Sequence, residues 1–182
     1  MRNVVVILCD QLRRDFLSMY GCDAVPTPNL DRLARTGVVF DNAITQSTVC
    51  APARASMMTG RYVSDHMVWT NDVPFRDGVE YLPVRMNELG YTTGAFGKLH
   101  HYPASDGKGF RRLSLMEEGR LGEDEPYLTW LRERHPDVER IWNHDGLAFA
   151  FDEHEYYEHW IASEAMQFIT DAVENSEPFL AW

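Results

Sequence analysis

The chain has 182 residues, of which 45% are hydrophobic, 12% aromatic and 25% charged. This balance excludes a disordered, collagenous or coiled-coil protein and predicts one folded core. Its 17 basic and 28 acidic residues give a formal charge of -11, so the chain lacks the basic surface on which general nucleic-acid binding depends.

The cysteines and the apolar segments indicate which cellular compartment the protein occupies. Cys9, Cys22 and Cys50 are an odd set at wide spacing, which argues against a disulfide framework and against a paired-cysteine zinc site. The apolar run at residues 4–9 is far shorter than the roughly 18 residues that span a bilayer, and no small-residue cleavage site follows it. We therefore expect a cytoplasmic protein with no membrane partner.

The first hundred residues alternate short strands and helices. Residues 4–8 are a continuous, mostly β-branched apolar run, which is typical of a strand buried on both faces of a parallel sheet. Asp10 and Gln11 follow it, where open α/β sheets bind their ligands. Prolines near helix starts and glycines after helix ends mark the next elements. In chain order we predict a helix at 27–37, a strand at 38–40, helices at 50–60 and 82–89, and a strand at 91–96.

The second part of the chain is less regular. Residues 103–125 are rich in glycine and acids and are predicted to lie outside the core. Helices are predicted at 126–134 and 153–175, the second amphipathic with an acidic outer face, and another strand begins at 178–182. Because the chain stops inside this apolar strand, we expect it to be the front portion of a longer protein.

These elements predict an α/β fold with a mostly parallel sheet flanked by helices on both faces. Residues 1–182 are expected to be the amino-terminal part of a catalytic domain. Its parts would be 1–100 with the core and site motifs, 101–152 as a variable excursion, and 153–182 as a helix and the start of a core strand.

One short motif points to chemistry. Cys50, Pro52 and Arg54 form C-x-P-x-R at a predicted helix start, and this chain's composition would give such a match by chance in roughly 1% of cases. The free N–H groups and the dipole of a helix start favour an anion near Cys50, and Arg54 lies one turn further on. The alternative is a small buried cysteine beside a surface arginine.

Residues 50–61, Cys-Ala-Pro-Ala-Arg-Ala-Ser-Met-Met-Thr-Gly-Arg, resemble the signature of the sulfatases of the alkaline phosphatase superfamily. The resemblance implies an alkaline phosphatase-like fold and a Cys50 that a maturation enzyme oxidises to formylglycine, with Arg54 holding the modified side chain. Gly97-Lys98-Leu99-His100 resembles the family's G-K-x-H motif, which implies that Lys98 contacts the sulfate and that His100 lies beside the nucleophile.

The resemblance also implies a metal site. Asp10 and Gln11 are similar to the family's first metal-ligand pair, although many members have a second aspartate where this chain has Gln11. With the converted Cys50 they would offer oxygen ligands, which suit Ca²⁺, or Mg²⁺ or Mn²⁺, better than zinc. Asp-Gln is frequent in the branch that contains phosphonate monoester hydrolases and choline-sulfatase-like enzymes. Asn71 resembles a polar site residue of that branch, and His101 is assigned to the pocket wall as a hypothesis.

The chemistry explains why these residue types are needed. In a hydrated aldehyde, one hydroxyl can attack sulfur or phosphorus, because a nearby cation lowers its pKa. Deprotonation of the other hydroxyl, with His100 as the base, expels the sulfate and restores the aldehyde. Lys98 and Arg54 would offset the charge on the ester oxygens. We therefore predict hydrolysis of a small-molecule sulfate ester.

Three alternatives remain open at this point. The same residues could hydrolyse a phosphonate or phosphate ester, which Gln11 and Asn71 favour. The chain could be a catalytically silent, sulfatase-like fragment that binds an anion. A cysteine-dependent phosphatase is disfavoured, because its anion loop needs a longer separation than that between Cys50 and Arg54. The alcohol group of the ester and the oligomeric state are not predicted.

Overall fold

The computed structural model describes residues 2–138, 142–143, 146–147 and 152–182. The chain divides into two compact units, of which the larger contains the residues up to Ile7 and Gln46–Trp182, and the smaller is Leu8–Thr45. The α-helices are α1 (Pro28–Thr36), α2 (Cys50–Thr59), α3 (Val63–His66), α4 (Leu82–Glu88), α5 (Pro126–Arg132) and α6 (Tyr157–Glu174). The strands are β1 (Val4–Val5), β2 (Thr92–Gly97), β3 (Arg112–Leu115), β4 (Trp142–Asn143), β5 (Gly146–Leu147) and β6 (Phe179–Ala181).

The larger unit is built on a parallel sheet of four strands in the order β1-β6-β2-β3. The central strand β2 pairs with β6, where Thr92 lies opposite Phe179, and with β3, where Gly97 lies opposite Leu115. In such a sheet the carboxyl ends of the strands share one edge. The residues that follow Gly97 therefore lie at the edge where α/β sheets place their sites.

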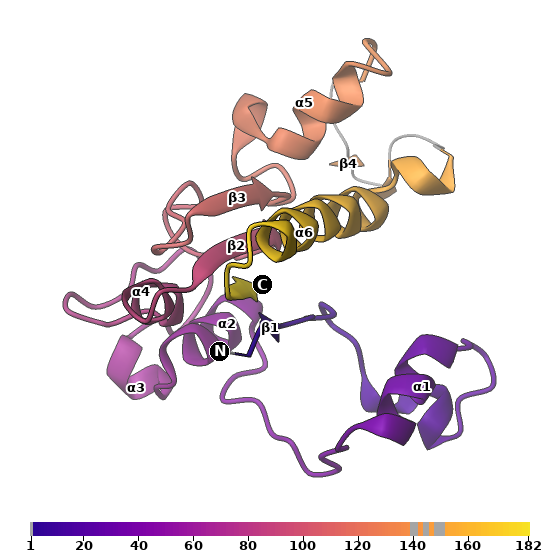
Figure 1. The fold of residues 1–182 in the computed structure, drawn as a ribbon, viewed down its shortest axis with the longest axis horizontal. Helices are drawn as coiled ribbons and strands as arrows, with labels where there is room; N and C mark the ends of the chain where they lie inside the picture. Colours follow the sequence, from indigo (N-terminus) through magenta and orange to yellow (C-terminus); the bar gives the residue numbers. More distant parts are fainter. Residues whose placement is uncertain (1, 139–141, 144–145, 148–151) are drawn as a thin grey trace. The chain divides into compact units, whose positions relative to one another are not determined.

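Helices cover both faces of this sheet (Figure 1). Adjacent residues of β2 point to opposite faces: Ala95 packs in one buried cluster with Met58 of α2, and Phe96 packs in another with Phe168 of α6. Residues from α4 join the first cluster and further residues of α6 join the second. The predicted fold class, a mostly parallel sheet with helices on both faces, is confirmed.

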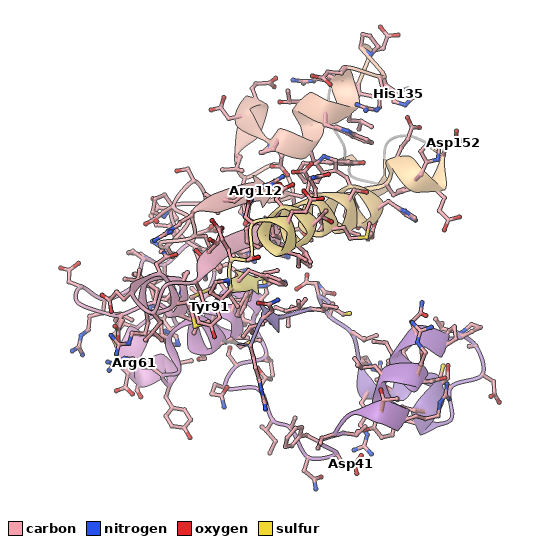
Figure 2. The ribbon with its side chains drawn as sticks, viewed as in Figure 1. Asp41, Arg61, Tyr91, Arg112, His135 and Asp152 are labelled. Carbon is pink, nitrogen blue, oxygen red and sulfur yellow. The ribbon has the colours of Figure 1, made fainter. Side chains whose placement is uncertain are left out.

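The long helix α6 is anchored to the sheet by packing and by charge. Arg112 of β3, labelled in Figure 2, donates to Asp171 of α6 at 3.1 Å. Its guanidinium also lies 3.6 Å from the carboxylate of Glu164. Near the start of α6, Trp160 packs against Tyr127 of α5 with ring centroids 5.6 Å apart. None of the helices in the described part of the chain is long and apolar enough to cross a membrane.

Three sequence-based expectations differ from the structure. Residues 112–115 form the core strand β3, although 103–125 was predicted to lie outside the core. The first strand covers only Val4–Val5, because its neighbour β6 offers just Phe179–Ala181 for pairing. Residues 38–40 are not a strand, since apolar β-branched residues form one only where another strand pairs with them. Parts of the expected excursion at 101–152, namely 139–141, 144–145 and 148–151, lie outside the described residues.

The smaller unit holds α1 and two short 3-10 helices. Ser18 and Thr27 bond reciprocally, each backbone N–H donating to the other's hydroxyl, at 3.0 and 2.7 Å. Asp41, labelled in Figure 2, accepts a hydrogen bond from the Tyr20 hydroxyl at 2.8 Å. These contacts fix the turns around α1.

Candidate active site

Cys50 is the first residue of α2, as the motif predicted. Val49 before it is extended, and α2 then runs ten residues to Thr59. The Cys50 thiol lies 3.5 Å from Oδ1 of Asn71, and the N–H of Ala51 donates to the same oxygen at 3.3 Å. Two residues separated by 21 positions thus meet at a helix start, where N–H groups favour an anion. The structure brings Asn71 to Cys50.

Arg54 links α2 to the loop after β2. It lies one turn beyond Cys50, is 5% exposed, and Nη1 donates to the carbonyl of Lys98. A buried guanidinium needs such partners because its charge is costly to remove from water. The contact joins the Cys50 helix to the segment that carries Lys98 and His100.

The last residue of β2, which leads into the following loop, is a glycine that no other residue could replace without strain. Gly97 has φ +85°, and a Cβ there would lie 2.8 Å from Cδ1 of Ile161. Lys98 follows with its ammonium 3.1 Å from Oε1 of Glu118. His100 has φ 56° and is buried, as is His101. The G-K-x-H segment is therefore a tight, buried turn.

The charge state of His100 is set by its surroundings. Burial is the largest cause that lowers its pKa, to about 4, and the cations of Arg120, Lys98 and Arg54 lower it further, while Glu118 opposes them. Among the described residues nothing bonds to its Nδ1. At neutral pH His100 is a neutral imidazole, the form that can accept a proton.

His101 is neutral for related reasons. Burial again comes first and lowers its pKa to about 3, with Lys108, Arg54 and His100 adding to the fall and Asp106 opposing it. Its ring packs against Phe75 with centroids 5.2 Å apart. This packing places His101 in an aromatic wall rather than on the surface.

A buried histidine that sequence reasoning missed braces the Asn71 segment. The N–H of Val68 donates to Nδ1 of His66 at 3.1 Å, so the ring proton is on Nε2, which donates to the Ser56 hydroxyl at 2.9 Å. Burial lowers the pKa of His66, which keeps this tautomer neutral. The chain before Asn71 is thereby tied to α2.

A pair of glutamates and an arginine were also missed. Glu117 is fully buried, and its carboxylate accepts the N–H groups of Leu99 and His100 at 2.6 and 3.0 Å. Arg120 donates to Glu117 at 2.7 Å and to Glu118 at 3.2 Å. In the sequence these residues belong to an acidic run that suggests a solvent-exposed segment. No local pattern predicts their contacts with residues about 18 positions earlier in the chain.

The predicted metal ligands lie elsewhere in the chain. Asp10 and Gln11 belong to the smaller unit, several residues beyond the end of β1 at Val5, and Gln11 has φ 56°. Among the described residues no three His, Cys, Asp or Glu side chains are grouped as a metal site would need. A carboxylate and an amide oxygen are nonetheless the donor types that a hard cation prefers, so these two residues fit Ca²⁺ or Mg²⁺ in chemistry.

Comparisons with known proteins identify relatives of this chain. The family model described as Sulfatase matches residues 2–182. The chain is 28% identical over 209 aligned residues to an arylsulfatase of Clostridium perfringens, covering 97% of this chain and 41% of that protein. It is 31% identical to iduronate 2-sulfatase of Homo sapiens, over 78% of this chain and 24% of that one.

A solved structure extends the comparison to the fold. The phosphonate monoester hydrolase of Agrobacterium radiobacter superposes with a TM-score of 0.78 at 27% identity, covering 100% of this chain and 40% of that chain. The chain thus spans about two fifths of the length of the arylsulfatase and of the phosphonate monoester hydrolase, and about a quarter of that of the iduronate 2-sulfatase. The matched family model covers nearly every residue, and the chain belongs to the sulfatase family.

Proposed function

We propose that this chain carries the nucleophile side of a sulfuric ester hydrolase, with residue 50 as the nucleophile after conversion to formylglycine. The observation that carries the proposal is the grouping at the start of α2: Cys50 beside Asn71, with Arg54 bonded to the backbone of Lys98. A small anion at this helix start would meet a partial positive charge and two cationic side chains. Membership of the sulfatase family supports the sulfate ester as the substrate class.

Each side chain has a role in the proposal. The hydrate of a formylglycine supplies one hydroxyl that attacks sulfur and expels the alcohol group of the ester, and a second whose deprotonation breaks the bond to the sulfate and restores the aldehyde. Asn71 orients residue 50, and Arg54 and Lys98 offset the charge of the ester oxygens. His100, neutral because its pKa is lowered to about 4, accepts the proton of the second hydroxyl. His101 closes the wall behind it.

The metal and the maturation enzyme complete the proposal. Asp10 and Gln11 would offer a carboxylate and an amide oxygen to a divalent cation, Ca²⁺ in the first place, and such a cation would lower the pKa of a hydroxyl bound to it. A formylglycine-generating enzyme would convert Cys50 with an external oxidant such as dioxygen: Cβ is oxidised to an aldehyde and the sulfur leaves. Loss of activity on chelation and recovery with Ca²⁺ would support the cation.

A second ester class is favoured by a specific contact. Asn71, which resembles a polar site residue of the phosphonate-hydrolase branch, has its Oδ1 3.5 Å from the Cys50 thiol. The phosphonate monoester hydrolase of Agrobacterium radiobacter shares the fold at a TM-score of 0.78. A phosphonate monoester would bind the same cations and be attacked by the same group. We rank it second because Lys98 and His100 keep the sulfatase motif.

The test compares both esters with matched variants. Protein produced with a formylglycine-generating enzyme is assayed with an aryl sulfate and an aryl phosphonate monoester, for the wild type, Cys50→Ala and Cys22→Ala. We expect the wild type and Cys22→Ala to prefer the sulfate and Cys50→Ala to lose activity. A preference for the phosphonate would contradict the sulfate ester as the substrate class and support the phosphonate monoester instead. Turnover of neither ester by converted protein would favour a silent, anion-binding role.

A further inference from the structure

The turn that carries Lys98 and His100 is held by the side chains of Arg54 and Glu117 and not by the sheet. The β2–β3 pairing ends where Gly97 lies opposite Leu115, with a last bond from the Met116 N–H to the Gly97 carbonyl at 3.2 Å. Beyond this point no strand in the described part of the chain pairs with the N–H groups of Leu99 and His100. The Glu117 carboxylate accepts both, at 2.6 and 3.0 Å.

Glu117 is suited to this task by its burial and by its partner. It is 0% exposed, and a buried carboxylate is stable only when it is bonded and its charge is paired. The two N–H groups of the turn bond to Oε1, and Arg120 donates to Oε2 at 2.7 Å. The carboxylate is thereby clamped between the turn and a guanidinium, and it cannot rotate without losing these bonds.

The neighbouring carboxylate faces the lysine of the same turn. Glu118 accepts from the Lys98 ammonium at 3.1 Å and from Arg120 at 3.2 Å. Arg120 therefore bridges both glutamates. Adjacent residues after β3 thus bond to the backbone at His100 and to the side chain of Lys98.

A second buried glutamate fixes Glu117 from behind. Glu125, also 0% exposed, accepts the N–H of Glu117 at 2.7 Å and that of Gly119 at 3.0 Å. The backbone that carries Glu117 is therefore bonded as firmly as its side chain. The arrangement transmits the position of the segment after β3 to the turn after β2.

We infer that Glu117 is a positioning residue, which sets the backbone of the Lys98–His100 turn so that both side chains face the ester bound at residue 50. This inference rests on the proposed function. It predicts that the Glu117 charge is needed to hold the turn, although Glu117 itself does not touch the substrate.

The test uses Glu117→Gln, which keeps the shape but removes the charge opposite Arg120, and the control Glu123→Gln, an exposed carboxylate of the same segment. Amide hydrogen exchange is measured by mass spectrometry on peptides covering 97–101 and on a peptide from α6. We expect faster exchange in 97–101 for Glu117→Gln alone. We also expect its kcat to fall by about 10- to 100-fold, with KM changing much less, because misplaced groups fail chiefly in the transition state.

The outcomes separate this inference from the proposed function. Unchanged exchange at 97–101 would overturn the positioning role, whatever the activity, and so would faster exchange with unchanged kcat in an active enzyme. If the wild type hydrolyses neither ester, the proposed function fails. A wild type without activity would also overturn the catalytic part of this inference, while exchange would still decide whether Glu117 holds the turn. If Glu117→Gln does not fold, Glu117→Asp is used instead, which keeps the negative charge on a shorter side chain. We expect it to give the same two effects, faster exchange at 97–101 and a lower kcat, but smaller ones.

Discussion

The buried imidazole of His101 should make the protein sensitive to mild acid. Its pKa is lowered to about 3 in the folded protein, first by burial and then by the charges of Lys108 and Arg54, with Asp106 opposing and His100 adding slightly. The unfolded chain would have a histidine pKa of about 6.5. Between these values the unfolded state binds more protons, so stability rises with pH across this window and is lost as the pH falls below about 6.5.

The size of the effect follows from the two pKa values. Between about pH 7.5 and about pH 5 the unfolded His101 takes up its proton while the folded one does not, which costs about 2 kcal/mol of unfolding free energy. The figure hardly depends on the folded pKa, provided that it lies well below 5. For a chain of this size the loss corresponds to a fall in Tm of about 4 to 8 °C.

The assay compares thermal unfolding of the wild type and of His101→Phe at both pH values. Phenylalanine keeps the ring contact with Phe75, whose centroid lies 5.2 Å away, and Nε2 of His101 has no partner to lose within the described part of the chain. We expect the variant to lose about 2 kcal/mol less than the wild type on acidification. His101→Gln, which also removes the titration, should behave the same way. Parallel pH curves for wild type and variants would refute the reasoning.

Three further predictions concern the scaffold of the site. Asn71→Ala removes the acceptor 3.5 Å from the Cys50 thiol and should lower kcat/KM about tenfold for either ester in steady-state kinetics; unchanged kinetics would deny Asn71 an orienting role. Gly97→Ala combines φ +85° with a Cβ 2.8 Å from Ile161 and should cost more than about 1 kcal/mol in urea denaturation, so a neutral effect would contradict the tight turn. His66→Phe leaves a buried hydroxyl and a buried N–H unpaired and should destabilise the protein by about 2 to 4 kcal/mol, whereas retained thermal stability would argue against this brace.

Features fixed by local chemistry could be predicted from the sequence. Pro28 near the start of α1 and Gly60 after the end of α2 marked helices that the structure confirms, because caps depend on neighbouring residues alone. The strand β3 was missed because its pairing with β2 is not local, and because the glycines and acidic residues of 103–125 indicated a segment outside the core.

In the candidate site, too, residues in local sequence motifs could be predicted, and residues defined by distant contacts could not. The motifs pointed to Cys50, Arg54 and Lys98, and the structure brings α2 and the β2 loop together through a bond between two of them. Glu117 could not be predicted, because an acidic residue is recognised as a structural partner only once the chain has folded over it. For Asp10 and Gln11 the role as metal ligands stays a prediction.

The most direct test of the central claim is the mass of the tryptic peptide 36–54, which contains Cys50 and ends at Arg54. The protein is produced together with a formylglycine-generating enzyme and digested with trypsin, and the mass of the peptide is measured by mass spectrometry. Conversion of the thiol to the aldehyde lowers the peptide mass by about 18 Da, and we predict this loss, accompanied by sulfate ester hydrolysis. A peptide that keeps the mass of an unmodified cysteine under these conditions would contradict the assignment of residue 50 as the nucleophile.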